Sequence, residues 1–209
     1  MNLHCPTDAG STEACSTEYV SWFASPLGSL RIGHDRHSIS RLDYETTAPV
    51  GALVSVLPLA WRQALADYFA GELDALRHLP ITLRQGTDFQ QQVWLSLRQI
   101  PAGRTYSYRQ LAQAIERPQA MRAVGQALSK NPISIILPCH RVILQSGGLG
   151  GYAGRSDIGQ MRKQFLLWHE CGFGAQRISS CPPHEKIAPL KHRKPPTKGD
   201  DVSHKDSAQ

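Results

Sequence analysis

The sequence predicts two parts of different fold class, a small α/β unit followed by a mainly α-helical unit. Strand-like segments lie on both sides of a turn signal within residues 19–44. Residues 58–71 have the apolar period of an amphipathic helix. From residue 87 onward, two capping boxes mark helix starts and helical patterns follow one another.

The α/β unit is expected over residues 19–83. YVSWFAS and SLRIG flank the turn PLG, which is a hairpin signal, and HSISRLDY alternates as a third strand would. PLAWRQALADYFAG is expected to form a helix, with Pro58 near its start and Gly71 at its end. LPITL (79–83) is a further extended segment. This unit is therefore predicted to be a small antiparallel sheet with one helix.

The helical unit is expected over residues 86–176. TDFQ (87–90) and SYRQ (107–110) each fit a capping box that opens a helix. Pro118 is expected to start the next helix, PQAMRAVGQALSK. Two short helices joined by a tight turn around Arg117 resemble a helix-turn-helix, although such a hairpin more often serves packing than DNA recognition. The small residues of the second helix would let it approach a groove closely, which favours a nucleic acid partner.

The two ends of the chain lack core-forming patterns. Residues 1–18 are expected to be a flexible leader, and residues 177–209 a disordered basic tail of Pro, Lys, His and Asp. No apolar run approaches the length of a membrane span, and no signal peptide is visible. The five cysteines are scattered and odd in number, which does not suggest a disulfide framework. We therefore expect a cytoplasmic protein without a membrane partner.

Positive charge is concentrated in one segment. Residues 98–163 contain ten Lys and Arg but two Asp and Glu, whereas residues 1–97 contain six against ten. A solvated basic face is one interpretation, and a surface that binds phosphates is the other. Composition alone does not decide between them.

The segment LPCHRV (137–142) contains the strongest candidate for chemistry. A cysteine becomes a good nucleophile when an imidazole can take its proton or a positive charge stabilises the thiolate. Cys139 and His140 are adjacent, so they need a bend or a bridging water to act together, and Pro138 makes a bend plausible. Cys139 could instead be a small buried hydrophobe. A metal is disfavoured because no second cysteine lies at ligand spacing.

These segments resemble one known family. NPISIILPCHRVI (131–143) is similar to the active-site signature of the O6-alkylguanine-DNA alkyltransferases, also called methylated-DNA–protein-cysteine methyltransferases. GTDFQQQVWLSLRQIPAGRTYSYRQLA (86–112), RAVGQAL, GYAG and LLWHE resemble further elements of that family, and SPLGSL (25–30) matches its N-terminal domain. The resemblance covers about residues 19–173.

The resemblance implies a role for each catalytic candidate. Cys139 would accept the alkyl group, and His140 would deprotonate it through a water. Glu170 would orient His140 and balance its charge. Tyr108 would donate a proton or hydrogen bond to the leaving guanine, and Asn131 would tie the end of the recognition helix to the active-site loop.

The resemblance also implies how DNA is held. Arg122 would take the place of the flipped nucleotide in the base stack. The residues expected to contact DNA are Arg122, Ala123, Gly125, Arg141 and Tyr108, and those expected to form the base pocket are Val142, Tyr152, Ala153 and Gly154.

The implied activity is direct DNA repair. The alkyl group of O6-alkylguanine, and of O4-alkylthymine, would pass irreversibly to Cys139 without a cofactor. The partner would be double-stranded DNA containing alkylated bases, bound by a monomer. The implied fold is a ribonuclease-H-like α/β domain followed by a helical domain with a winged helix-turn-helix. Two alternatives remain: a sensor that binds alkylated bases without removing them, and a thiol hydrolase.

Two departures from the family pattern accompany the resemblance. RSDIG (155–159) is interpreted as an insertion in the loop between the pocket and the final helix, which affects the pocket rim. Some family members bind a structural zinc in the N-terminal domain. Cys5, His34, His37 and His78 are irregularly spaced, so we expect no metal here.

Overall fold

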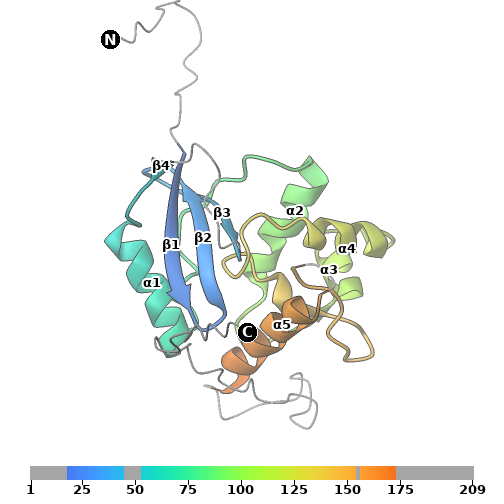
Figure 1. Cartoon of the computed structure of the whole chain (residues 1–209). Helices are drawn as coiled ribbons and strands as arrows, with labels where there is room; N and C mark the ends of the chain where they lie inside the picture. Colours follow the sequence, from blue (N-terminus) through green and yellow to red (C-terminus); the bar gives the residue numbers. More distant parts are fainter. Residues whose placement is uncertain (1–17, 45–52, 154–155, 173–209) are drawn as a thin grey trace, which may run out of the picture.

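A computed structural model of the 209-residue chain describes residues 18–44, 53–153 and 156–172 (Figure 1). The predicted tail, residues 177–209, lies outside the described residues, as does the predicted leader apart from Glu18.

The N-terminal half contains a four-stranded sheet with the order β3-β2-β1-β4. Its strands are β1 (Tyr19–Ser25), β2 (Gly28–His34), β3 (Ile39–Asp43) and β4 (Leu53–Val54). The pairs β1–β2 and β2–β3 are antiparallel, which confirms the predicted small antiparallel sheet. The short β4 was not predicted, and it pairs parallel to β1.

Helix α1 (Leu59–Ala70) lies beside the sheet (Figure 1). Pro58 precedes its first residue, and Gly71 ends it with a φ of 116°, a left-handed conformation that glycine adopts at little cost. Both ends therefore lie where the sequence predicted them. The helix buries Trp61, Leu65 and Tyr68, and its C-terminal end approaches the end of the last helix, α5 (Figure 1).

The second half is mainly helical, as predicted. Its elements are α2 (Asp88–Ser96), η1 (Leu97–Gln99), β5 (Tyr106–Ser107), α3 (Tyr108–Ala114), α4 (Met121–Ser129), η2 (Cys139–Arg141), β6 (Val142–Ile143) and α5 (Asp157–Gly172). Thr87 and Ser107 each complete a capping box with the glutamine three residues later. Strands β5 and β6 pair parallel to each other.

Two predicted boundaries are wrong. Helix α4 begins at Met121 instead of Pro118, because residues 117–120 form a turn in which the Ala120 amide donates to the Arg117 carbonyl at 2.8 Å. The presumed loop insertion is largely helical, since Asp157–Gly159 form the first turn of α5. Ser156 caps that turn by accepting from the Gly159 amide at 3.2 Å.

The two halves share one hydrophobic core, and backbone pairing also joins them. The Leu42 amide in β3 donates to the Pro132 carbonyl, and the Ser134 amide donates back to the Leu42 carbonyl, each at 2.9 Å. The sheet edge thus fixes the loop that leads to Cys139. Among the described residues, no helix has the length and apolar character needed to cross a bilayer.

Candidate active site

Cys139, His140 and Arg141 form one turn of 3-10 helix, η2. Such a turn has about three residues, so neighbouring side chains point in different directions. The turn supplies the bend that the adjacent cysteine and histidine require. Upstream, Ile135 has a φ of 71°, a conformation that is strained for a β-branched residue by about 1–3 kcal/mol. The packing around this loop therefore holds its backbone in a strained conformation just before Cys139.

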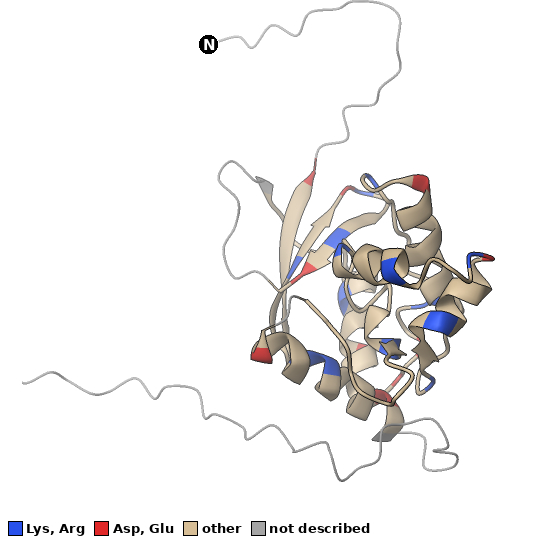
Figure 2. Cartoon of the chain, turned by 90° about the vertical axis from the view of Figure 1, so that its right-hand side faces the viewer, with Lys and Arg blue, Asp and Glu red and all other residues tan. Residues whose placement is uncertain are grey.

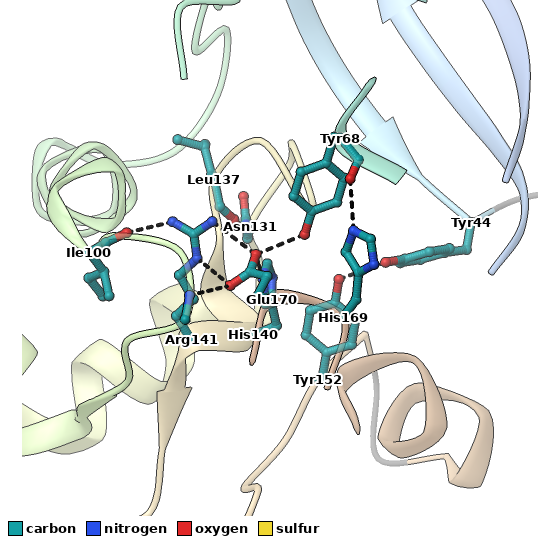
Figure 3. Close-up of polar contacts among 11 residues, drawn as sticks. Tyr44, Tyr68, Ile100, Asn131, Leu137, His140, Arg141, Tyr152, His169 and Glu170 are labelled. Atoms are coloured by element: carbon teal, nitrogen blue, oxygen red, sulfur yellow. Dashed lines mark hydrogen bonds and ion pairs between the residues drawn. The ribbon is translucent and has the colours of Figure 1, made fainter. Parts of the chain in front are cut away.

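Glu170, near the end of α5, is the centre of a buried polar network (Figure 3). His140 Nε2 lies 2.8 Å from Glu170 Oε1. Arg141 donates to both carboxylate oxygens, from Nε to Oε2 and from Nη2 to Oε1, each at 2.9 Å. The Tyr68 hydroxyl in α1 donates to Oε1 at 2.8 Å. Two separate elements, η2 and α1, therefore fix this carboxylate.

The network sets the charges of its members. Burial alone would raise the pKa of Glu170, but His140 and Arg141 together lower it well below its usual range, so the group is ionised. Burial lowers the pKa of His140, and Glu170 only partly offsets this. His140 is therefore neutral at rest. It lies beside a carboxylate that can stabilise the imidazolium once His140 accepts a proton.

The second ring nitrogen of His140 has no protein partner. Among described side chains, His140 Nδ1 is the buried nitrogen or oxygen that lacks a hydrogen bond. Buried polar atoms are seldom left unpaired, and an ordered water is the usual partner where protein supplies none. Because Nε2 faces Glu170, Nδ1 is the nitrogen left to receive a proton.

Cys139 is free and almost completely buried. Burial raises the pKa of its thiol, while a hydrogen bond from the Asn131 side chain and the charge of Lys163 act in the opposite direction. The thiol is thus protonated at rest and needs a base. Lys163 is itself fully buried, and burial lowers its pKa to about 8.

Asn131 follows the last turn of α4 and joins it to the active-site loop. Its Nδ2 donates to the Leu137 carbonyl at 2.8 Å, and its Oδ1 accepts from the Ile133 amide at 3.1 Å. This is the tie between helix and loop that the resemblance implied.

Cys139 opens onto a pocket of about 780 Å³. This volume is within the range of small-molecule sites. The pocket is lined by Tyr108, Met121, Arg122, Gly125, Gln126, Leu128, Ser129, Cys139, Leu144, Gly150, Gly151, Tyr152 and Ala153. Gly150 has a φ of 68°, and a Cβ there would come within 2.7 Å of the Tyr108 hydroxyl. Glycine at this position lets the loop approach Tyr108.

The structure separates the predicted DNA and pocket residues into groups. Tyr108, Arg122, Gly125, Tyr152 and Ala153 line the pocket, Ala123 is exposed outside it, and Gly154 lies outside the described residues.

The predictions for Arg141 and Val142 are corrected by their surroundings. Arg141 is buried, and its guanidinium binds Glu170 and the Ile100 carbonyl, so its hydrogen bonds lie within the site instead of on the expected DNA contact. Val142, expected in the base pocket, is fully buried and outside the pocket lining, and its carbonyl accepts from Lys163 Nζ at 2.6 Å.

The comparisons with known proteins agree with this site. Residues 88–172 match the family described as 6-O-methylguanine DNA methyltransferase, DNA binding domain. The methylated-DNA–protein-cysteine methyltransferase of Haemophilus influenzae is 39% identical over 155 residues, which cover 71% of this chain and 84% of that protein. The chain belongs to this methyltransferase family. The resemblance inferred from the sequence is therefore confirmed.

The share of the sequence that aligns with this chain differs among the other family members. The Salmonella typhimurium methyltransferase is 54% identical over 106 residues, and the match spans 59% of that protein and 51% of this chain. Among solved structures, Mycobacterium tuberculosis OGT in complex with DNA is 39% identical with a TM-score of 0.65. That match covers 74% of this chain and 94% of that one.

Within this methyltransferase fold, the sequence alone missed Lys163 and Tyr68. Lys163 precedes Glu170 by seven residues, which places both on one face of a helix, and this spacing is a signal that could have revealed it. Tyr68 had no such signal, because it reaches Glu170 from α1, 102 positions away.

The other titratable groups of the described residues form no cluster typical of a metal site. No group of three or more His, Cys, Asp and Glu could hold a metal within the described part of the chain. His34 instead contacts Ser21 Oγ at 2.8 Å and the Asp35 carbonyl at 2.8 Å. Cys171 is disulfide-bonded, which departs from the expectation that the cysteines do not pair.

Proposed function

We propose that this chain repairs DNA by transferring the alkyl group of O6-alkylguanine to Cys139 in a single irreversible step. The observation that carries the proposal is the unpartnered, buried Nδ1 of His140 next to a free cysteine at the floor of an open pocket. The names of its relatives support the same activity, as methylated-DNA–protein-cysteine methyltransferases. O4-alkylthymine offers the same kind of oxygen-bound alkyl carbon and belongs to the proposal.

The reaction begins with proton transfer. A water relays the Cys139 proton to His140 Nδ1, and Glu170 stabilises the imidazolium through Nε2. The positive charge of Lys163 favours the thiolate.

Alkyl transfer to the thiolate then follows in the pocket. The sulfur attacks the alkyl carbon, a carbon–sulfur bond forms, and the bond from carbon to guanine O6 breaks. Tyr108 protonates the departing guanine, the His140 imidazolium releases its proton to solvent, and solvent water returns a proton to Tyr108, so the base leaves neutral. Burial raises the pKa of Tyr108, which keeps its proton available until that moment. The thioether product cannot be hydrolysed by these groups, and the protein acts once.

The substrate must leave the duplex to reach Cys139. Arg122, exposed at the rim of the pocket, is suited to fill the gap left by the flipped nucleotide. Lys and Arg outnumber Asp and Glu over the helical half (Figure 2), which favours contact with phosphates. In this proposal α3, α4 and the β5–β6 pair act as a winged helix-turn-helix, and the sheet with α1 as a ribonuclease-H-like domain.

The wider setting belongs to the same proposal. The protein acts as a monomer on double-stranded DNA in the cytoplasm. It needs no cofactor, because the DNA supplies the alkyl group and Cys139 accepts it.

A stoichiometry experiment tests this function. The protein is mixed with a tenfold excess of duplex DNA containing O6-methylguanine, and the repaired guanine is counted over time. We expect one lesion repaired per protein molecule and then no further reaction. Cys139→Ala should bind the same DNA and repair none. Repeated turnover, or DNA binding without loss of the methyl group, would reject the proposal, and the second result would favour a damage sensor.

A further inference from the structure

Tyr152 forms part of the pocket wall, and its hydroxyl contacts a residue from the other half of the molecule. The Tyr152 hydroxyl lies 2.7 Å from the Tyr44 hydroxyl (Figure 3). Tyr152 is 5% exposed, so its hydroxyl is shielded from bulk water. The family resemblance implied a place for Tyr152 in the pocket, whereas it implied no role for Tyr44, which is 108 positions away.

Tyr44 is held firmly enough to act as an anchor. It directly follows β3, whose backbone is paired to the active-site loop. On its other side, the guanidinium carbon of Arg162 in α5 lies 4.0 Å from the centre of the Tyr44 ring, which is a cation–π contact. The two tyrosine rings meet edge to face, with centroids 6.2 Å apart. The sheet and α5 therefore both restrain Tyr44.

The hydroxyl pair is a bond between two neutral groups. Burial raises the pKa of Tyr44 and of Tyr152, so both phenols keep their protons. One hydroxyl donates to the other. If the Tyr44 hydroxyl were absent, the Tyr152 hydroxyl would be buried without this partner, and a buried unpaired hydroxyl is unfavourable. Rotation of the Tyr152 ring toward water would relieve it and would move the pocket wall.

The position of Tyr152 also bears on the chemistry. Its ring lies edge-on to His140, with centroids 6.3 Å apart, and it lines the same pocket as Cys139. A shift of this ring would change the space available to the alkyl group beside the sulfur.

We propose that Tyr44 is a positioning residue that fixes the Tyr152 ring in the pocket wall and thereby sets the size of the alkyl group accepted. This inference rests on the proposed alkyl transfer to Cys139. It makes adduct selectivity depend on the N-terminal sheet, which does not itself line the pocket.

Tyr44→Phe tests the proposal, because it keeps the ring beneath Arg162 and removes only the hydroxyl. Transfer from O6-methylguanine should slow by about fivefold, the size expected for one hydrogen bond. Transfer from O6-benzylguanine should be unchanged or faster, because the wall is looser. Tyr19→Phe, in β1 and outside the pocket lining, makes the same chemical change and should alter neither rate. Equal slowing of both substrates, or no slowing, would overturn the proposal.

A double-mutant cycle isolates the hydroxyl pair. In the Tyr152→Phe background, Tyr44→Phe should have little further effect on the ratio of methyl to benzyl rates, because the hydroxyl that needed a partner is gone. Additive effects of the two substitutions would contradict the proposal.

A readout independent of alkyl transfer separates this inference from the proposed function. Cys139 is modified with iodoacetamide and, separately, with a bulky pyrene maleimide, and the product is located by peptide mapping. Tyr44→Phe should raise the relative rate of the bulky reagent at Cys139, whether or not the protein repairs DNA. An unchanged ratio of the two reagents would show that Tyr44 does not set the pocket wall.

Discussion

Cys139 lies between a closed side, the buried network of His140, Arg141 and Glu170, and an open side, the pocket. The two sides differ in how fully their polar and apolar groups are paired or covered. Behind it, His140, Arg141 and Glu170 are buried and joined by short hydrogen bonds, and one buried nitrogen among them is unpaired. In front of it, an open pocket includes the exposed apolar side chains Met121 and Leu144. In the proposed reaction, the groups that would move the proton are thus organised before substrate arrives, whereas the recognition side would gain its partner only when DNA binds.

Glu170→Gln should damage the closed side most. The amide cannot balance the imidazolium, and it leaves Arg141 buried beside a neutral group. We expect transfer to slow by about 10²–10⁴-fold and the free energy of unfolding to fall by about 3–5 kcal/mol. Rapid-quench kinetics and urea denaturation measure the two effects. Glu72→Gln, exposed just after α1, is the matched control and should change neither. A variant with normal stability and rate would show that the network is not needed.

Arg122→Ala should damage only the open side. Repair in duplex DNA should slow by about tenfold or more, because nothing replaces the flipped nucleotide in the stack. Reaction with the free base O6-benzylguanine should be unchanged, since it needs no flipping. Arg62→Ala, exposed on α1, is the charge-matched control. Equal losses on both substrates would remove the role given to Arg122.

The pH dependence of transfer reports on the thiol between the two sides. Because burial raises the pKa of Cys139, the thiolate fraction should increase with pH, by at most about tenfold per unit. Lys163, with a pKa of about 8, loses its charge above that pH, so the rise should flatten there. Lys163→Met should displace the profile to higher pH. Rates of His140→Ala, which lacks the internal base, with free O6-benzylguanine between pH 6 and 9 measure this, and a flat profile in that variant would contradict the assignment of a protonated resting thiol.

Tyr68→Phe should have the smallest effect. It removes one of several donors to Glu170 while His140 and Arg141 remain. We expect transfer to slow by a few-fold and stability to fall by about 1 kcal/mol. The variant is assayed beside Tyr19→Phe. An effect as large as that of Glu170→Gln would mean that α1, and not η2, controls the carboxylate.

The sequence could predict the features that depend on neighbouring residues. Thr87 and Ser107 reveal helix starts because each capping box closes within one turn. The site was found because Cys139 and His140 are consecutive and their segment resembles a family signature. Glu170 could be placed only through that resemblance, since α5 is far along the chain.

Features that depend on tertiary contacts could not be predicted in this way. The direction of Arg141 depends on the η2 turn, so the resemblance, which implied a DNA contact, could not show that the guanidinium binds Glu170. Tyr44 and Tyr68 reach the site from the N-terminal half, and no local pattern marks a tyrosine whose partner is more than a hundred positions away. Proline has a fixed φ that suits a helix start, but Pro118 belongs to the turn of residues 117–120 between α3 and α4, so α4 begins after it.

The most direct test of the account is the location of the transferred group. The protein is reacted with duplex DNA containing O6-methylguanine, and its intact mass and peptide map are recorded. We predict a gain of one methylene, located on Cys139, and no such gain in Cys139→Ala. His140→Ala should give the same product on Cys139 more slowly, because some thiolate forms without its base. A methyl group on another residue, or repaired DNA with Cys139 unmodified, would contradict the account.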